Sequence, residues 1–250
     1  MAKRLTDFTV AEECLKDIDV VILAGGLGTR LASVLADRPK VLAAVGDRPY
    51  LAFLLDWLKR FGACRIIFGL GHLAGSVASY LEVNKPDGVD IETIVEQQPL
   101  GTGGAIANLR SAIRSDPALI LNGDSFIDAD LCKFLASHRK SGADSSILCT
   151  DVPDTSRFGS VLIGENDRII EFQEKQPGRG PGSINAGIYL FGPDMLEHIM
   201  VSGPSLENDV FQKLPAGTLH AMNGKFTFLD IGTPEDLARA PKILKPFMVE

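Results

Sequence analysis

The chain has 250 residues, of which 45% are hydrophobic and 23% charged, which is the composition of an ordinary globular protein. Its formal net charge of −7 disfavours binding to nucleic acid or to an anionic membrane surface. Because the first residues are charged and no apolar run is long enough to cross a bilayer, we expect neither a secretory leader nor a membrane span.

Hydrophobic periodicity predicts alternating strands and helices over the first 150 residues, after a short extension at 1–18. Strands are expected at 20–23, 65–70, 89–95, 118–121 and 145–150, with helices at 49–61, 73–81, 104–113 and 131–138. Such alternation is typical of a doubly wound, mostly parallel sheet between two layers of helices, a three-layer α/β/α fold.

The second half of the chain is less regular. Turn residues between two apolar runs predict a hairpin of strands 160–163 and 168–172, followed by a loop at 176–182. Further strands are expected at 184–191 and 226–231, and helices at 193–200, 207–214 and 234–240. No linker is evident, so we predict a single domain over 19–250 with a distinct subregion at about 150–225.

The four cysteines have neither the spacing of a zinc site nor that of a redox pair. We therefore expect all of them to be reduced residues of the core or surface, as in a cytoplasmic protein. They are Cys14, Cys64, Cys132 and Cys149. The four histidines show no catalytic grouping either.

The most informative segment is 19–31, with the sequence DVVILAGGLGTRL. A buried strand runs into a glycine-rich turn in which Gly25, Gly26 and Gly28 allow positive φ and close approach of a ligand. Exposed amides in such a turn bind anions, and Arg30 adds donors suited to phosphate. The turn lies at the carboxyl end of a strand, where ligands bind in open α/β sheets.

Two better-known glycine loops do not fit this segment. A P-loop requires Lys and then Ser or Thr after its last glycine, whereas Gly28 is followed by Thr29-Arg30. A dinucleotide fingerprint beginning at Gly26 would need a third glycine where Leu31 stands. We therefore expect a phosphate-binding loop of another kind, with Arg38 and Lys40 adding positive charge nearby.

Two aspartates follow other predicted strands, Asp124 in Asn122-Gly123-Asp124 and Asp230 in 229–234. Carboxylates that converge from two strand ends, together with phosphate oxygens, are the ligands that Mg²⁺ prefers. The segment 96–104 (EQQPLGTGG) also follows a strand and opens a helix, so a nucleobase could lie on its backbone. No activated nucleophile stands out, and this combination of cations and carboxylates favours phosphoryl or nucleotidyl transfer.

Together these motifs resemble the sugar-1-phosphate nucleotidyltransferase family over about residues 19–240. The resemblance rests on five segments in the family's order. They are 23–31 with 38–40, 99–105, 122–124, 185–189 and 230–234. It implies that a sugar 1-phosphate attacks the α-phosphorus of an NTP, giving an NDP-sugar and pyrophosphate without a covalent enzyme intermediate.

The resemblance also implies roles for individual residues. Arg30, Lys40 and Asp124 are expected to be catalytic, and Asp124 and Asp230 to carry Mg²⁺. The expected nucleotide-binding residues are Leu23, Ala24, Gly25, Gly26, Gly28, Thr29, Glu96, Gly101, Thr102 and Asn122. The subregion at about 150–225 becomes the sugar-binding part, with Gly159, Glu174, Lys175 and Asn185 facing the sugar phosphate. No carboxyl-terminal β-helix domain is expected.

Within the family, the loop at 101–105 and the segment 205–211 (SLENDVF) are most similar to enzymes that use GTP and D-glycero-α-D-manno-heptose 1-phosphate. Mannose-1-phosphate guanylyltransferases and N-acetylmuramate-1-phosphate uridylyltransferases share much of the pattern. A catalytically silent protein that binds sugar nucleotides is the alternative of another class. The sequence leaves open whether the chain is a monomer or a homo-oligomer.

Overall fold

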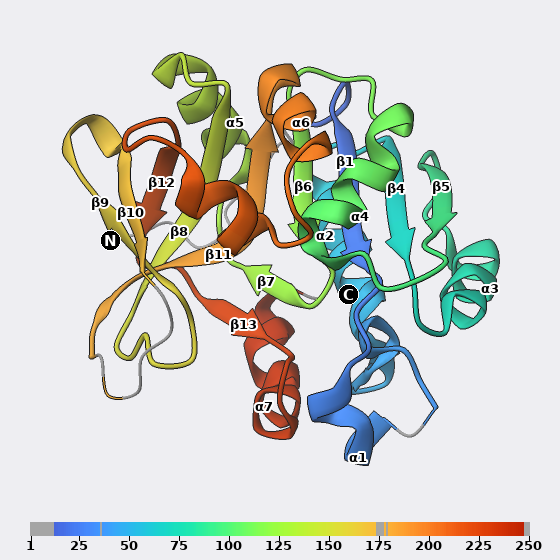
Figure 1. The fold of residues 1–250 in the computed structure, drawn as a ribbon. Coiled ribbons are helices and arrows are strands. Elements are labelled where there is room, and N and C mark those ends of the chain that lie inside the picture. The colour runs from blue at the N-terminus through green and yellow to red at the C-terminus, as the bar shows by residue number, and fades with distance from the viewer. Residues whose placement is uncertain (1–12, 36, 174–177, 179, 248–250) are drawn as a thin grey trace.

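The computed structural model describes residues 13–35, 37–173, 178 and 180–247, which form a nine-stranded sheet with helices on both faces (Figure 1). The strand order is β10-β9-β11-β6-β1-β4-β5, with β8 paired to β11 and β12 paired to β8. The predicted doubly wound α/β architecture is confirmed. Within this described part, no helix has the length and apolar character needed to cross a membrane.

The first half of the sheet is entirely parallel. β1 (Asp19–Ala24) lies between β6 (Ala118–Asn122) and β4 (Arg65–Leu70), and β5 (Asp90–Val95) forms the edge. The short apolar runs of β1, β4 and β6 suit strands covered on both faces. The helices of this half are α1 (Ala32–Leu35), α2 (Tyr50–Arg60), α3 (Ala74–Asn84) and α4 (Gly101–Leu109), and a small hairpin joins β2 (Ala44–Val45) to β3 (Arg48–Pro49).

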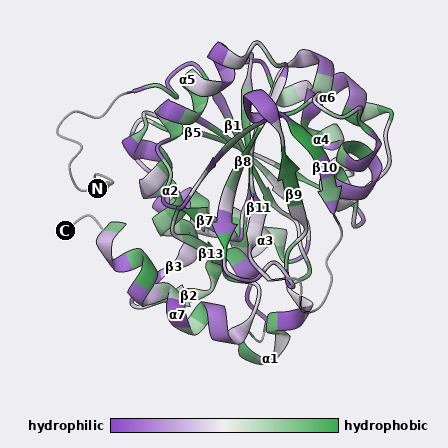
Figure 2. Cartoon of the chain, turned by 90° about the vertical axis from the view of Figure 1, so that its left-hand side faces the viewer, coloured by the Kyte–Doolittle hydropathy of each residue, from purple (hydrophilic) through white to green (hydrophobic). Residues whose placement is uncertain are grey.

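Alternating side chains of β1 enter two separate hydrophobic cores. Val20 and Ile22 belong to the core under α2, α3, α5 (Leu131–Ser141) and α7 (Pro234–Leu244). Val21 belongs to the core under α4 and α6 (Pro193–Met200). Figure 2 shows the resulting layers, with α2 and α5 on one side of the central strands and α4 and α6 on the other. Successive side chains of a strand point to opposite faces of the sheet, so the two cores lie on opposite faces of β1 and make a three-layer arrangement.

The second half of the sheet is mostly antiparallel. The predicted hairpin is present as β9 (Ser160–Ile163) and β10 (Ile169–Gln173), and β11 (Gly182–Phe191) pairs antiparallel with β6, β8 and β9. β8 (Ser145–Val152) pairs in parallel with β12 (His220–Gly224), a strand that the sequence analysis did not predict. The short segment HAMNG has too little alternation to be recognised as a strand.

Two other predicted elements differ in the structure. The helix expected at 207–214 is a π-helical turn, Leu206–Val210, followed by the 3-10 turn Phe211–Lys213. The strand expected at 226–231 is only β13 (Phe228–Asp230), which pairs with β7 (Ser125–Ile127) in a separate two-stranded sheet. Asp230 therefore reaches the cleft from outside the main sheet.

The prediction that all four cysteines are reduced is wrong for two of them. Cys14 and Cys132 form a disulfide across 118 residues, which links the segment before β1 to α5. Leu15 and Ile18 of that segment are buried in the main core, so tertiary packing brings the thiols together, and sequence spacing does not reveal this. Burial raises the pKa of the free Cys149 thiol to about 12, whereas Cys64 is exposed.

The histidines also form a group that their spacing did not reveal. His138 Nδ1 lies 2.8 Å from Ser146 Oγ, and His220 Nδ1 lies 3.1 Å from the same hydroxyl. Both rings are buried behind the sheet, between α5, β8 and β12. Burial lowers the pKa of each histidine, so this group is built around neutral rings.

Candidate active site

A cleft of three connected hollows lies at the carboxyl ends of the parallel strands. The first, the glycine-loop pocket, has a volume of about 300 Å³ and lies between the loop after β1 and the start of α4. The second, the carboxylate pocket, measures about 370 Å³ and contains Asp124 and Asp230. The third, the side chamber, measures about 290 Å³. Thr102, Asn122 and Asp124 line the first and second hollows, and Gly159, Asn185 and Glu207 line the second and third.

Most of the residues expected to bind a nucleotide line the glycine-loop pocket. They are Leu23, Gly25, Gly26, Glu96, Gly101, Thr102 and Asn122. Ala24, Gly28 and Thr29 are not among its lining residues, because Ala24 packs against the core and the chain leaves the pocket after Leu27. Of the three loop glycines only Gly28 has a positive φ, so the expectation of positive φ at Gly25 and Gly26 is wrong.

The backbone at Gly25 lies close to a side chain. A Cβ added there would clash with Glu96 Oε1, and a Cβ at Gly71 would clash with the same oxygen. The Glu96 carboxylate therefore lies against two glycine backbones, and its Oε2 accepts a hydrogen bond of 3.3 Å from the Leu100 amide. This contact joins the loop after β1 to the loop after β5.

The start of α4 is hydrogen-bonded to the segment 204–206. Gly101 has a φ of 73°, and the amide of Gly103 donates to Pro204 O at 2.8 Å. Thr102 Oγ1 accepts a hydrogen bond of 2.9 Å from Leu206 N. The Thr102 hydroxyl, which was expected to face base or ribose, thus has a structural partner in segment 205–211.

A backbone pairing outside the main sheet brings the two aspartates together. Asp230 is opposite Ser125 in the β13–β7 register, and the Ile231 amide donates to Asp124 O at 3.0 Å. Asp124 immediately precedes β7, so both carboxylates enter the carboxylate pocket beside Arg30. The predicted convergence of these three residues is therefore present.

Lys40 bridges the two carboxylates, and its side chain is only 13% exposed. Its Nζ donates to Asp124 Oδ2 at 2.6 Å and lies 3.7 Å from Asp230 Oδ1. Lys40 therefore pairs with both carboxylates, and its expected role toward phosphate stays a prediction. Arg38 is exposed and is absent from the residues that line the three hollows.

The electrostatics of this pair suit a cation. Burial raises the pKa of Asp230, and the neighbouring Asp124 raises it further, while Lys40 and Arg30 oppose the rise. Asp230 Oδ1 is buried without a hydrogen-bond partner among the described residues. Two carboxylates that meet in a pocket with room for phosphate oxygens are ligands of the kind that Mg²⁺ prefers.

Tyr50, at the start of α2, is a neighbour that the sequence analysis did not single out. Its hydroxyl is buried and has no hydrogen-bond partner within the described part of the chain. Burial raises the pKa of Tyr50 well above its usual value, and Asp124 and Asp230 add to the rise. The phenol therefore remains neutral beneath the carboxylates and forms part of their low-dielectric surroundings.

Two of the four residues expected to face the sugar phosphate lie in the cleft. Gly159 and Asn185 line both the carboxylate pocket and the side chamber. Asn185 Oδ1 accepts a hydrogen bond of 2.9 Å from Gly187 N, and Nδ2 donates to Tyr189 Oη at 2.9 Å. Glu174 and Lys175 lie outside the described residues.

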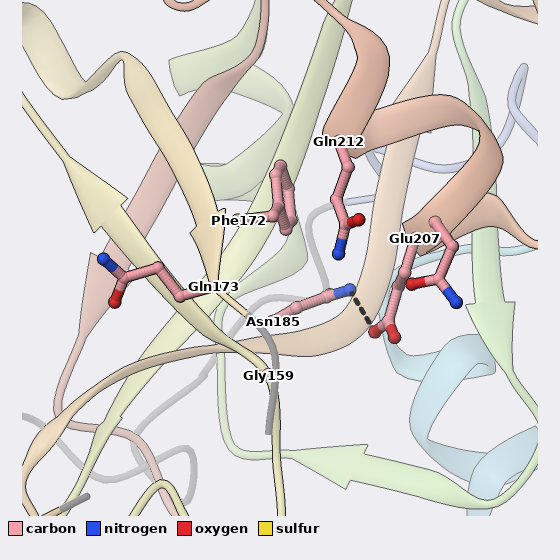
Figure 3. A pocket seen from close by; sticks show the side chains of 7 residues that line it. Gly159, Phe172, Gln173, Asn185, Glu207 and Gln212 are labelled. Atoms are coloured by element: carbon pink, nitrogen blue, oxygen red, sulfur yellow. Dashed lines mark hydrogen bonds between the residues drawn. The ribbon is translucent and has the colours of Figure 1, made fainter. Parts of the chain in front are cut away.

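The structure adds cleft residues to the predicted set. Phe172, Glu207 and Gln212 line the side chamber, and Glu207 reaches Asn185 (Figure 3). The segment 205–211 resembles a family motif, but its irregular turn does not reveal from sequence which side chains face the cleft. Gln212 could be found from sequence only by comparing relatives that bind different sugars.

The cleft can be compared with known proteins once its geometry is clear. A family model described as "Nucleotidyl transferase" matches residues 19–245. A mannose-1-phosphate guanylyltransferase from Mycobacterium tuberculosis is 34% identical over 226 residues, which cover 89% of this chain. The chain spans only 63% of the length of that relative.

Two further relatives are similar over almost their whole length. A D-glycero-α-D-manno-heptose 1-phosphate guanylyltransferase from Campylobacter jejuni is 34% identical over 223 residues, which cover 88% of this chain and 96% of the relative. The crystal structure of HddC from Yersinia pseudotuberculosis complexed with GMP-PN has a TM-score of 0.79 and 35% identity. That match covers 90% of this chain and 98% of HddC.

Proposed function

This chain belongs to the nucleotidyl transferase family, and we propose that it transfers a guanylyl group from GTP to D-glycero-α-D-manno-heptose 1-phosphate. The products are the GDP-heptose and pyrophosphate. The observation that carries the proposal is the assembled cleft, in which Arg30, Asp124 and Asp230 share one pocket beside the glycine loop. The sugar and the base rest on the heptose enzyme and on HddC, whose matches span nearly the whole of each relative.

The reaction requires one displacement at phosphorus. A phosphate oxygen of the sugar 1-phosphate attacks the α-phosphorus of GTP, and the bond from that phosphorus to the β-phosphate bridging oxygen breaks. The departing pyrophosphate takes the electron pair. Catalysis of this kind depends on positioning and charge stabilisation, for which the cleft offers Arg30 and the loop amides near Gly26.

Asp124 and Asp230 are the residues that would hold Mg²⁺. The ion would neutralise charge on the reacting phosphates. Lys40 fixes the position of both carboxylates through contacts of 2.6 and 3.7 Å, which makes it a positioning residue in this proposal. Its charge also lowers the cost of holding two acidic groups so near each other.

Each end of the cleft receives one substrate in this proposal. The guanine and ribose lie in the glycine-loop pocket, against Gly101 and the backbone near Glu96. The sugar 1-phosphate enters the carboxylate pocket from the side of Gly159 and Asn185. Glu174 and Lys175 keep their expected role toward its phosphate, on the strength of the family resemblance.

Mannose 1-phosphate is the second candidate acceptor, because the relative from Mycobacterium tuberculosis is a mannose-1-phosphate guanylyltransferase with 34% identity. A silent nucleotide-sugar-binding protein is the remaining alternative. The charged group of Arg30, Lys40 and the two aspartates favours an enzyme over a binding protein without activity. Binding alone does not require this concentration of charge.

A screen of pyrophosphate release tests the proposal. GTP and UTP are each paired with the heptose, mannose and N-acetylmuramate 1-phosphates, in Mg²⁺ buffer. We expect the highest kcat/KM with GTP and the heptose 1-phosphate. A higher value with UTP or with mannose 1-phosphate would reject the assigned specificity, and no release with any pair would reject the enzyme proposal.

We also propose that the protein acts in the cytoplasm, where GTP is available. The Cys14–Cys132 disulfide is unusual for that compartment. Cell fractionation followed by immunoblotting should recover the protein with a cytoplasmic marker. Recovery with secreted or envelope proteins would contradict this location.

A further inference from the structure

The side chamber is an open hollow that adjoins the carboxylate pocket. It continues the carboxylate pocket past Gly159 and Asn185, away from the glycine loop, and has a volume of about 290 Å³. A water molecule in the liquid occupies about 30 Å³. The side chamber therefore has room for several heavy atoms of a substrate and is too large to be a packing defect.

The polar groups of the side chamber converge from one strand and two consecutive turns. Asn185 is on β11, whereas Glu207 and Gln212 come from the turns Leu206–Val210 and Phe211–Lys213 (Figure 3). Asn185 Nδ2 lies 3.5 Å from Glu207 Oε1. Within the described part of the chain, Glu207 forms no ion pair and the Gln212 amide forms no hydrogen bond.

The aromatic part of the lining is packed against other rings. The Phe172 ring stacks on Phe211 with centroids 5.1 Å apart and an interplanar angle of 21°. Phe211 is buried and also contacts Tyr189 at 5.5 Å. Ser160 Oγ donates to Gln173 Oε1 at 3.1 Å, which keeps that amide at the edge of the wall. The result is an aromatic face opposite a carboxylate and an amide.

This combination suits neutral hydroxylated carbon atoms. A carboxylate accepts hydrogen bonds from two neighbouring hydroxyls, an amide can both donate and accept, and an aromatic face covers C–H groups. Among the described residues that line the side chamber, the charged group is an acid, Glu207, and none is a cation that could bind a phosphate. It therefore favours part of a sugar over a second phosphate.

We propose that the side chamber receives the exocyclic carbons of the acceptor sugar, and that Glu207 and Gln212 recognise vicinal hydroxyls at the end of this tail. The inference rests on the proposed function. Because the reacting phosphate lies at Asp124 and Asp230, the sugar ring extends past Asn185 and its tail points into the side chamber. A seven-carbon sugar places an added CHOH unit there, whereas a six-carbon sugar leaves Gln212 unpaired.

The test compares two acceptors in three variants. Steady-state kcat/KM is measured with GTP and either the heptose or the mannose 1-phosphate, for Glu207→Gln, Gln212→Ala and the control Glu165→Gln. Glu165 lies in an exposed turn between β9 and β10. Glu165→Gln therefore makes the same chemical change as Glu207→Gln, but away from the cleft. Thermal melting of each variant checks that it is folded.

We expect Glu207→Gln and Gln212→Ala each to lower kcat/KM for the heptose substrate about tenfold, the size of one lost hydrogen bond to a polar or charged group. The value for mannose 1-phosphate should change by less than about threefold, and the KM for GTP should stay constant. The result is therefore read from the ratio of kcat/KM for the heptose 1-phosphate to kcat/KM for mannose 1-phosphate. Glu165→Gln should leave the ratio at the wild-type value.

The outcomes separate this inference from the proposed function. If the wild type releases no pyrophosphate with either acceptor, the proposed function fails. If the wild type is active but both variants lower kcat/KM equally for the two acceptors, or leave both values unchanged, the side chamber does not recognise the tail. This inference is then wrong. In that second case the guanylyltransferase proposal still stands.

Discussion

The two halves of the cleft are built in different ways. On the nucleotide side, parallel strands end in glycine-rich loops, and the lining is largely backbone, with Gly25, Gly26 and Gly101 as examples. On the acceptor side, antiparallel strands and an irregular turn present side chains such as Asn185, Glu207 and Gln212. Backbone recognition suits a triphosphate common to many relatives, whereas side chains can change with the sugar.

The halves are joined at three places. The Thr102–Leu206 hydrogen bond links the start of α4 to the acceptor turn. The β7–β13 pairing brings Asp230 to Asp124 between them. The Cys14–Cys132 disulfide links the segment before β1 to α5, which precedes β8. Each connection gives a way to test how far the halves act as one unit.

The largest expected effect is at the proposed metal site between the two halves. Asp124→Asn removes one ligand charge without changing side-chain volume, so we expect kcat to fall about 10³-fold while the fold survives. EDTA should likewise abolish pyrophosphate release, and Mg²⁺ should restore it. The control is Asp87→Asn in an exposed turn. Full activity of metal-free enzyme would contradict the assignment.

The second effect concerns stability. Cys14→Ser opens a loop closed across 118 residues, and the unfolding free energy should fall by about 3 kcal/mol through greater chain entropy of the unfolded state. Urea denaturation, with and without reductant, measures this change. Cys64→Ser, which removes an exposed free thiol, should have almost no effect. Equal stability of Cys14→Ser and wild type would show that the link between the halves carries no free energy.

The third effect tests the contact between α4 and the acceptor turn. Gly101→Ala places a Cβ 2.5 Å from Pro204 O at a φ of 73°. Left-handed backbone costs about 1–2 kcal/mol for a residue with a Cβ, so we expect kcat/KM to fall about tenfold for GTP and for the sugar phosphate together. Gly75→Ala in α3 meets no atom within 4 Å and is the control. A loss confined to GTP would show that the halves are independent.

The smallest effect belongs to the acceptor half alone. Burial lowers the pKa of His138 and His220 below the usual 6.5, so the folded protein holds them neutral while the unfolded chain takes up protons as the pH falls. Stability should therefore be complete above pH 6.5 and decrease by about 1 kcal/mol toward pH 5.5, since one proton corresponds to 1.4 kcal/mol per pH unit. His220→Gln should reduce this slope in urea denaturation. A pH-independent wild type would contradict the prediction.

Local patterns in the sequence were enough to determine the parallel half and the position of its glycine-rich loop. Apolar runs at 20–23 and 65–70 are strands because they are covered on both faces, and the residues after them must lie at one edge of the sheet. The positions of Leu23, Gly25 and Asn122 in one pocket follow from that rule. Asp230 was also expected at this edge, although its strand belongs to another sheet.

Only the tertiary structure decided the partners of individual side chains. Lys40 meets Asp124 across 84 residues, Cys14 meets Cys132 across 118, and Gln212 enters the side chamber from a turn without regular periodicity. Such contacts depend on how distant elements pack and on strand register, and neither leaves a trace in local spacing. The sequence by itself therefore determined the nucleotide half of the cleft, whereas folding determined its charge pairing and the shape of its acceptor half.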